Sequence, residues 1–169
     1  MKSKKNLVLL GMMGSGKSTI GSFLAKRLNL RFYDVDHEIE SKIKMSISEI
    51  FEKKGEIEFR SIEEKMTLNL LNKVNCVISL GGGGFVNNKI RKETQKSKTI
   101  WLDCNAKIII NRIRKNKKRP LIENLSDNEI KKLIFSRSKV YSKSKYRINC
   151  NNMTKKEIVD KIVGIHESF

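Results

Sequence analysis

The sequence predicts an α/β fold, a three-layer α-β-α sandwich built on a five-stranded parallel sheet. One observation is that short apolar runs alternate along the chain with segments of helical spacing, which is typical of a parallel sheet with helices on both faces. A second is that three Ser/Thr–Glu pairs have the spacing of a helix-capping box. The expected strands are Asn6–Leu10, Arg31–Asp34, Cys76–Leu80, Thr99–Leu102 and Tyr146–Asn149.

The helices can be placed by apolar periodicity and by capping signals. After the first strand, apolar residues recur at intervals of three and four and predict one stripe facing the sheet; they are Ile20, Phe23, Leu24 and Leu28. In a capping box, a Ser or Thr side chain and a Glu further along each bond the other's backbone N–H group. Three further helix starts are therefore expected at Ser46 with Glu49, Ser126 with Glu129, and Thr154 with Glu157.

The length of 169 residues fits one domain, 1–169, which can bury an apolar core without disulfides. The net charge of +18 raises nucleic-acid binding as an alternative function. The excess is spread from Lys2 to Lys161, however, whereas a nucleic-acid footprint usually clusters on one face. We therefore expect no specific nucleic-acid partner.

The three cysteines, Cys76, Cys104 and Cys150, lie far apart and never form a C-x-x-C pair. Neither a disulfide framework nor a zinc site is indicated, so buried thiols are expected. No apolar run approaches the ~20 residues needed to cross a bilayer, and the first residues lead directly into a strand. We expect a cytoplasmic protein with no membrane partner.

The segment Gly11–Ser18 matches the phosphate-loop pattern G-x-x-x-x-G-K-[ST], with a strand before it and an amphipathic helix after it. Glycines permit the tight loop whose N–H groups face phosphates, and the helix N-terminus adds positive potential. Lys17 is expected to contact the β- and γ-phosphates of ATP, and Ser18 to offer its hydroxyl to Mg²⁺. The other expected nucleotide-binding residues of this segment are Gly14, Ser15, Gly16 and Thr19.

A phosphate loop alone does not separate a kinase from an ATPase or a GTPase. The sequence has no N-K-x-D motif for guanine and is short for a motor or helicase core, so a small kinase is the expected class. At the end of the second strand, Asp34 and Asp36 should lie on one side of the sheet edge. One carboxylate could serve the metal and the other an acceptor hydroxyl.

Two further segments suggest how an acceptor could be held. Arg60, expected near a helix start, could clamp an acceptor carboxylate in bidentate fashion, although an ordinary surface arginine is the alternative. The run Gly81–Gly84 follows the third strand and would let the backbone approach a small ligand closely. Between Arg114 and Glu123 the chain is rich in Lys and Arg and holds the only proline, which predicts a mobile loop.

Taken together, these motifs resemble shikimate kinases over nearly the whole chain. The motifs, in the order seen in that family, are Gly11–Ser18, Asp34-x-Asp36, Gly55–Arg60, Gly81–Gly83 and Arg119–Leu121. The resemblance implies transfer of the γ-phosphate of ATP to the 3-hydroxyl of shikimate, in the route to chorismate and the aromatic amino acids. Alternatives are a kinase for another small polyol acid, such as gluconate, and a basic ATP-using nucleic-acid-binding protein.

The resemblance also implies residue roles. Lys17, Asp36 and Arg119 would be catalytic, and Mg²⁺ would be held near Ser18 and Asp34. The shikimate-binding region would span about 34–62, and a mobile lid about 112–124. The shikimate ligands would be Asp36, Arg60, Gly82 and, from the segment Arg137–Tyr141, Arg137. On the nucleotide side, Arg112 would lie near adenine and Arg119 over the phosphates. A monomer that uses ATP and shikimate is expected.

Overall fold

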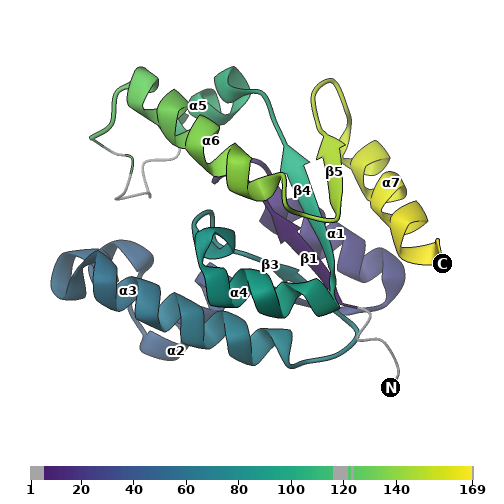
Figure 1. The fold of residues 1–169 in the computed structure, drawn as a ribbon, viewed down its shortest axis with the longest axis horizontal. Coiled ribbons are helices and arrows are strands. Elements are labelled where there is room, and N and C mark those ends of the chain that lie inside the picture. Colours follow the sequence, from purple (N-terminus) through teal and green to yellow (C-terminus); the bar gives the residue numbers. More distant parts are fainter. Residues whose placement is uncertain (1–5, 116–121, 123, 169) are drawn as a thin grey trace.

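Five parallel strands form one sheet in the order β2-β3-β1-β4-β5 (Figure 1). The structure is a computed structural model that describes residues 6–115, 122 and 124–168. Every predicted strand is confirmed, with ends that differ by at most one residue. The strands are β1 (Leu7–Leu10), β2 (Arg31–Asp34), β3 (Cys76–Ser79), β4 (Lys98–Asp103) and β5 (Tyr146–Asn149).

The central strand β1 carries the phosphate loop at its carboxyl end. It pairs with β3 on one side and β4 on the other, so that Leu7 lies opposite both Val77 and Lys98. All four β1 residues are buried, because a central strand of a parallel sheet is covered on both faces. The phosphate loop therefore follows the central, fully buried strand of the sheet.

Helices cover both faces of the sheet, as the sandwich requires. On one face α1 packs against α7, and on the other α3 packs against α4, with α6 beside the turn that follows β3 (Figure 1). No helix among the described residues is long and apolar enough to cross a membrane. The helices are α1 (Lys17–Leu28), α2 (Val35–Ile43), α3 (Ile47–Leu71), α4 (Asn88–Glu93), α5 (Ala106–Lys115), α6 (Asp127–Tyr141) and α7 (Lys155–Glu167), with 3₁₀ turns η1 (Gly84–Val86) and η2 (Thr94–Lys96).

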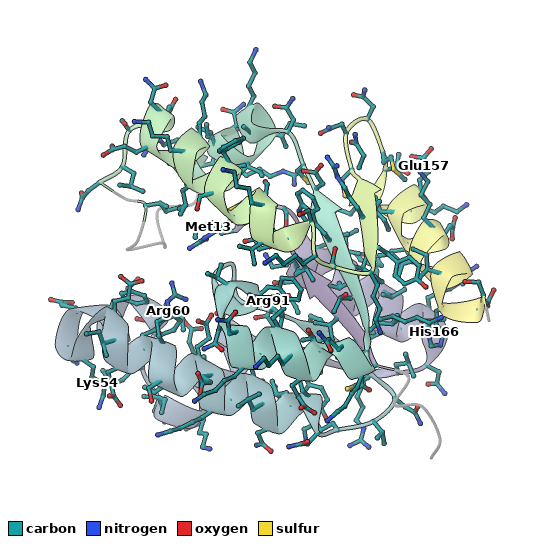
Figure 2. All side chains as sticks on the ribbon, viewed as in Figure 1. Met13, Lys54, Arg60, Arg91, Glu157 and His166 are labelled. Carbon is teal, nitrogen blue, oxygen red and sulfur yellow. The ribbon has the colours of Figure 1, made fainter. Side chains whose placement is uncertain are left out.

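All three predicted capping boxes are confirmed, at the starts of α3, α6 and α7. In α7, Thr154 accepts a hydrogen bond from the N–H of Glu157 at 3.3 Å, and the Glu157 carboxylate accepts one from the N–H of Thr154 at 2.6 Å (Figure 2). Each box satisfies backbone donors that the first helical turn would otherwise leave unpaired. Short local motifs thus fix where these helices begin.

The predicted apolar stripe of α1 is only partly right. Ile20 and Leu24 are buried, but Phe23 is 56% exposed. The helix is rotated so that Gly21 meets the sheet, where a Cβ would lie 2.4 Å from Cε2 of Phe32. Because the phenyl ring of Phe32 needs that space, the small residue takes the buried position and Phe23 turns toward solvent.

Helix α3 is kinked at Gly55, whose φ of 81° and ψ of 171° interrupt the helix. Residues with a side chain rarely adopt this conformation, which is accessible to glycine. The rings of Phe51 and Phe59 pack across the kink with centroids 4.5 Å apart. The kink divides α3 into an arm that contacts α2 and a longer arm that carries Arg60.

Candidate active site

The phosphate loop joins β1 to α1 and depends on three glycines in left-handed backbone conformations. Gly11, Gly14 and Gly16 have φ values of 146°, 79° and 93°, a region that side chains rarely allow. The amino group of Lys17 donates to the carbonyls of Gly11 and Met12, both at 2.9 Å. The lysine is thus held against the loop, next to the N–H groups at the start of α1.

A cavity of about 480 Å³ opens over this loop. All the predicted nucleotide-binding residues from Gly14 to Thr19 line it, together with Arg112. The Arg112 guanidinium donates to the carbonyl of Gly14 at 2.9 Å and so joins α5 to the loop. Sequence reasoning assigned nothing to the loop after β5, yet Met153 lines the same cavity.

Ser18 and Asp34, the predicted metal-side pair, lie in contact. The Ser18 hydroxyl donates to the Asp34 carboxylate, which also accepts from the N–H groups of Asp36 at 3.1 Å and His37 at 3.3 Å. Two hard oxygen ligands beside a phosphate loop fit Mg²⁺, which usually takes few protein ligands and completes its shell with phosphates and water. In keeping with this, no cluster of three or more His, Cys, Asp or Glu residues that could hold a metal occurs in the described chain.

Asp34 and Asp36 do not share a strand face as the sequence predicted. Strand β2 ends at Asp34, which caps α2, and Asp36 lies in the first helical turn. An aspartate is a strong helix N-cap. The strand therefore ends at Asp34, and the alternation of its side chains between the two sheet faces does not extend to Asp36. Both aspartates line the open space beside Ser18, but Asp34 bonds the Ser18 hydroxyl, whereas Asp36 also lines a second cavity.

This second cavity brings the predicted acceptor residues together from four parts of the chain. Its lining includes Asp36, Arg60, Gly82 and Arg137, and Met13 of the phosphate loop. Of these, Met13 and Arg60 are labelled in Figure 2. Arg60 lies near the start of the second arm of α3, shortly after the kink at Gly55, close to the helix start that the sequence predicted. This cavity is much smaller than the one over the phosphate loop, with a volume of about 30 Å³.

The glycine run after β3 lets charged side chains lie directly on the backbone. A Cβ on Gly81 would be 2.4 Å from Oε1 of Glu63, and one on Gly83 would be 2.5 Å from Nη1 of Arg60. On Gly82 it would lie 3.2 Å from Nη1 of Arg137. Each glycine thus makes room for a different charged group.

Glu63 is the member of this site that sequence reasoning missed. It is 3% exposed, and its carboxylate accepts from Nη1 of Arg60 at 2.6 Å. Burial raises the pKa of Glu63, while Arg60 lowers it and the Asp36 carboxylate raises it further. The three-residue spacing of Arg60 and Glu63 on a helix was the available signal.

Arg137 and Tyr141 enter the site from α6. Arg137 is 8% exposed and points Nη1 toward the sulfur of Met12 at 3.6 Å. The Tyr141 hydroxyl donates to the carbonyl of Gly82, and burial raises the pKa of this phenol to about 12. The hydroxyl therefore stays protonated and fixes the glycine run to α6.

The predicted lid falls largely outside the described residues. Arg119 and the rest of Arg119–Leu121 are among those left out, so their roles stay predictions. Arg114, expected in the loop, belongs to the last turn of α5 and bonds Asp127 at 2.9 Å. The basic segment therefore begins as helix.

A parallel sheet with a phosphate loop at its central strand, flanked by a nucleotide-sized cavity and a smaller charged one, defines a P-loop kinase for small molecules. A family model described as shikimate kinase matches residues 13–166. The chain belongs to the shikimate kinase family.

Individual relatives agree with that assignment. Curated shikimate kinases from Sulfurihydrogenibium sp. and Persephonella marina are 39% and 38% identical, covering 94% and 95% of this chain and 96% and 98% of their own. The crystal structure of shikimate kinase from Aquifex aeolicus matches with a TM-score of 0.82 at 38% identity, covering 94% of each chain. The shikimate kinase from Acinetobacter baumannii in complex with shikimate matches with a TM-score of 0.92 at 30% identity, over 97% of this chain and 93% of its own.

Proposed function

We propose that this chain transfers the γ-phosphate of ATP to the 3-hydroxyl of shikimate, giving shikimate 3-phosphate and ADP in the route to chorismate. The observation that carries the proposal is the second cavity, where two arginines and an aspartate from separate elements line one space beside the phosphate loop. Membership of the shikimate kinase family and the likeness to a shikimate-bound structure support it. They do not favour gluconate or nucleic acid as the target.

On the acceptor side, the charges suit a small hydroxy acid. Arg60 and Arg137 would pair with the shikimate carboxylate, because guanidinium groups bind carboxylates in bidentate fashion. Asp36 would accept hydrogen bonds from ring hydroxyls and turn one of them toward the phosphate. With Gly82 at the ring side, these residues would supply positioning, which is most of what phosphoryl transfer requires.

On the nucleotide side, Lys17 would move its positive charge from the loop carbonyls to the transferring phosphate. The apolar surface of Ile108 and Met153 in the same cavity suits a flat base, and Arg112 lies close enough to the loop to join it. Arg119 would add a second cation from the lid, whose closure stays a prediction. The single domain 1–169, the monomeric state and the cytoplasmic location also stay predictions.

Mg²⁺ is the implied metal, and Ser18 and Asp34 would hold it, the hydroxyl directly and the carboxylate through the water shell. When bound, it would neutralise charge on the β- and γ-phosphates.

The test is ADP release by the purified protein with Mg-ATP and shikimate, gluconate or no acceptor. Shikimate-dependent release is expected, with little from gluconate. Lys17→Ala should abolish it, whereas Lys26→Ala, an exposed lysine on the same helix, should leave it unchanged. Equal release with and without shikimate in the unsubstituted protein would overturn the proposal.

A further inference from the structure

Cys104 and Cys150 occupy matching positions just past the ends of two paired strands. The last residues of β4 and β5, Asp103 and Asn149, are register partners, and the N–H of Cys150 donates to the carbonyl of Asp103 at 2.8 Å. Neighbouring strands lie about 4.8 Å apart, and disulfides join Cα atoms about 4.4–6.8 Å apart. At the last register pair, immediately before the two cysteines, the usual strand spacing thus falls within the range that disulfides join.

Both thiols line the nucleotide cavity and are free. They are 8% and 9% exposed and line that cavity, so a small reagent in the cavity can reach them. The sulfur of Cys104 lies 3.5 Å from the carbonyl oxygen of Ser15 in the phosphate loop. The phosphoryl transfer proposed above uses neither thiol.

The two thiols differ in reactivity. The neighbouring Cys150 side chain lowers the pKa of Cys104 to about 7, and the positive charges of Arg112 and Lys17 add to this, while burial and Asp103 oppose it. The same contact raises the pKa of Cys150. Because the thiolate is the nucleophile, Cys104 is the sulfur that reacts first.

Cys76 provides the contrast within the same chain. It is fully buried at the start of β3, where its sulfur lies 3.4 Å from the side-chain oxygen of Asn6, and burial raises its pKa. It lines no part of the nucleotide cavity. Cys76 therefore serves as the unreactive control thiol for Cys104 and Cys150.

We propose that Cys104 and Cys150 form a reversible disulfide in the nucleotide cavity when the protein meets a peroxide. The Cys104 thiolate attacks one peroxide oxygen, the O–O bond breaks, and a sulfenic acid and hydroxide form; the hydroxide takes up a proton from solvent and becomes water. The Cys150 thiol then attacks the Cys104 sulfur, the S–S bond forms, and hydroxide leaves and takes the Cys150 proton as water. Two thiols lose two electrons in all, and one peroxide gains them.

The disulfide should weaken nucleotide binding. An S–S bond is about 2.05 Å long, and a Cys104 sulfur held in it has no S–H group to donate to the Ser15 carbonyl. The phosphate loop loses that contact, and the cavity wall changes shape. In reducing compartments, disulfides are usually transient and serve in catalysis or redox sensing.

The experiment uses the reduced full chain, treated with hydrogen peroxide with and without ATP. Peptide mapping by mass spectrometry should find a Cys104–Cys150 cross-link, and prior ATP binding should slow its formation. The Kd for ATP, measured by calorimetry without shikimate, should rise several-fold and return to its starting value with dithiothreitol.

Single-cysteine variants identify the pair. Cys76→Ser should keep both the cross-link and the change in Kd. Cys150→Ser should lose the cross-link and leave a Cys104 sulfenic acid that dimedone traps. A cross-link through Cys76, three intact thiols after peroxide, or a cross-link with unchanged Kd would overturn the proposal. Because these measurements need neither turnover nor shikimate, their outcome is independent of the proposed phosphoryl transfer.

Discussion

Replacing Arg60 by Met should destabilise the fold by leaving the Glu63 carboxylate buried without its nearest cation. The Glu63 side chain is 4% exposed and that of Arg60 is 30% exposed. Removing one partner of a fully buried ion pair costs about 3–5 kcal/mol. Since Arg60 is partly solvated and Glu63 can take up a proton, we expect about 2 kcal/mol at high pH, or a fall in Tm of about 4–8 °C.

The cost should depend on pH in a defined direction. Burial raises the pKa of Glu63 above its unfolded value, so its protonated form favours the folded state: that contribution is complete below the unfolded pKa and is lost as pH rises through the folded pKa. Arg60 lowers the pKa of Glu63, so Arg60→Met raises it further and extends the loss to higher pH. The destabilisation by Arg60→Met should therefore shrink as pH falls toward the ordinary carboxyl range.

Urea unfolding, followed by circular dichroism at about pH 8 and about pH 5, measures this. The set comprises the unsubstituted protein, Arg60→Met, Glu63→Gln and the double variant, because a double-mutant cycle isolates the pair. Adding Arg60→Met to Glu63→Gln should cost much less than Arg60→Met alone. Equal costs at both pH values and in both backgrounds would refute the buried-pair reasoning.

Three further substitutions have expected outcomes. Gly21→Ala places a Cβ 2.4 Å from Phe32; overpacking of about 1–3 kcal/mol should outweigh the ~1 kcal/mol gain in helix propensity, and a raised Tm would contradict this. Tyr141→Phe removes the donor to Gly82 and should cost about 1–2 kcal/mol in urea unfolding, an unchanged midpoint being the contrary result. Thr154→Ala should cost about 1 kcal/mol and increase amide exchange at the start of α7, whereas unaltered exchange would argue against the cap.

The sheet and helix starts could be predicted because their signals are local. Buried parallel strands are short apolar runs, and a capping box needs only two residues at fixed spacing. The exposure of Phe23 could not be predicted in this way. It depends on Phe32, a strand residue outside the helix, which claims the space beside Gly21.

In the candidate site, too, features with a local sequence signal could be predicted, whereas features that depend on tertiary packing could not. The phosphate loop is one contiguous motif, so its residues could be named from the sequence and all lie on one cavity. Asp34 and Asp36 were assigned correctly as neighbours, but the position of Asp36 beside the second cavity depends on a helix that begins directly after Asp34. Glu63 and Met153 were not predicted as site residues, because their place in the site follows from tertiary packing and not from a motif.

Met13 lines both the nucleotide cavity and the smaller charged cavity. A methionine side chain is unbranched and changes rotamer easily, so this one wall can take up the shape that either occupant imposes. If binding of the first occupant reorients the Met13 side chain, the free-energy cost of that reorientation does not arise again when the second occupant binds. By thermodynamic linkage the coupling is reciprocal, so whatever ATP does to the affinity for the acceptor through Met13, the acceptor does in equal measure to the affinity for ATP.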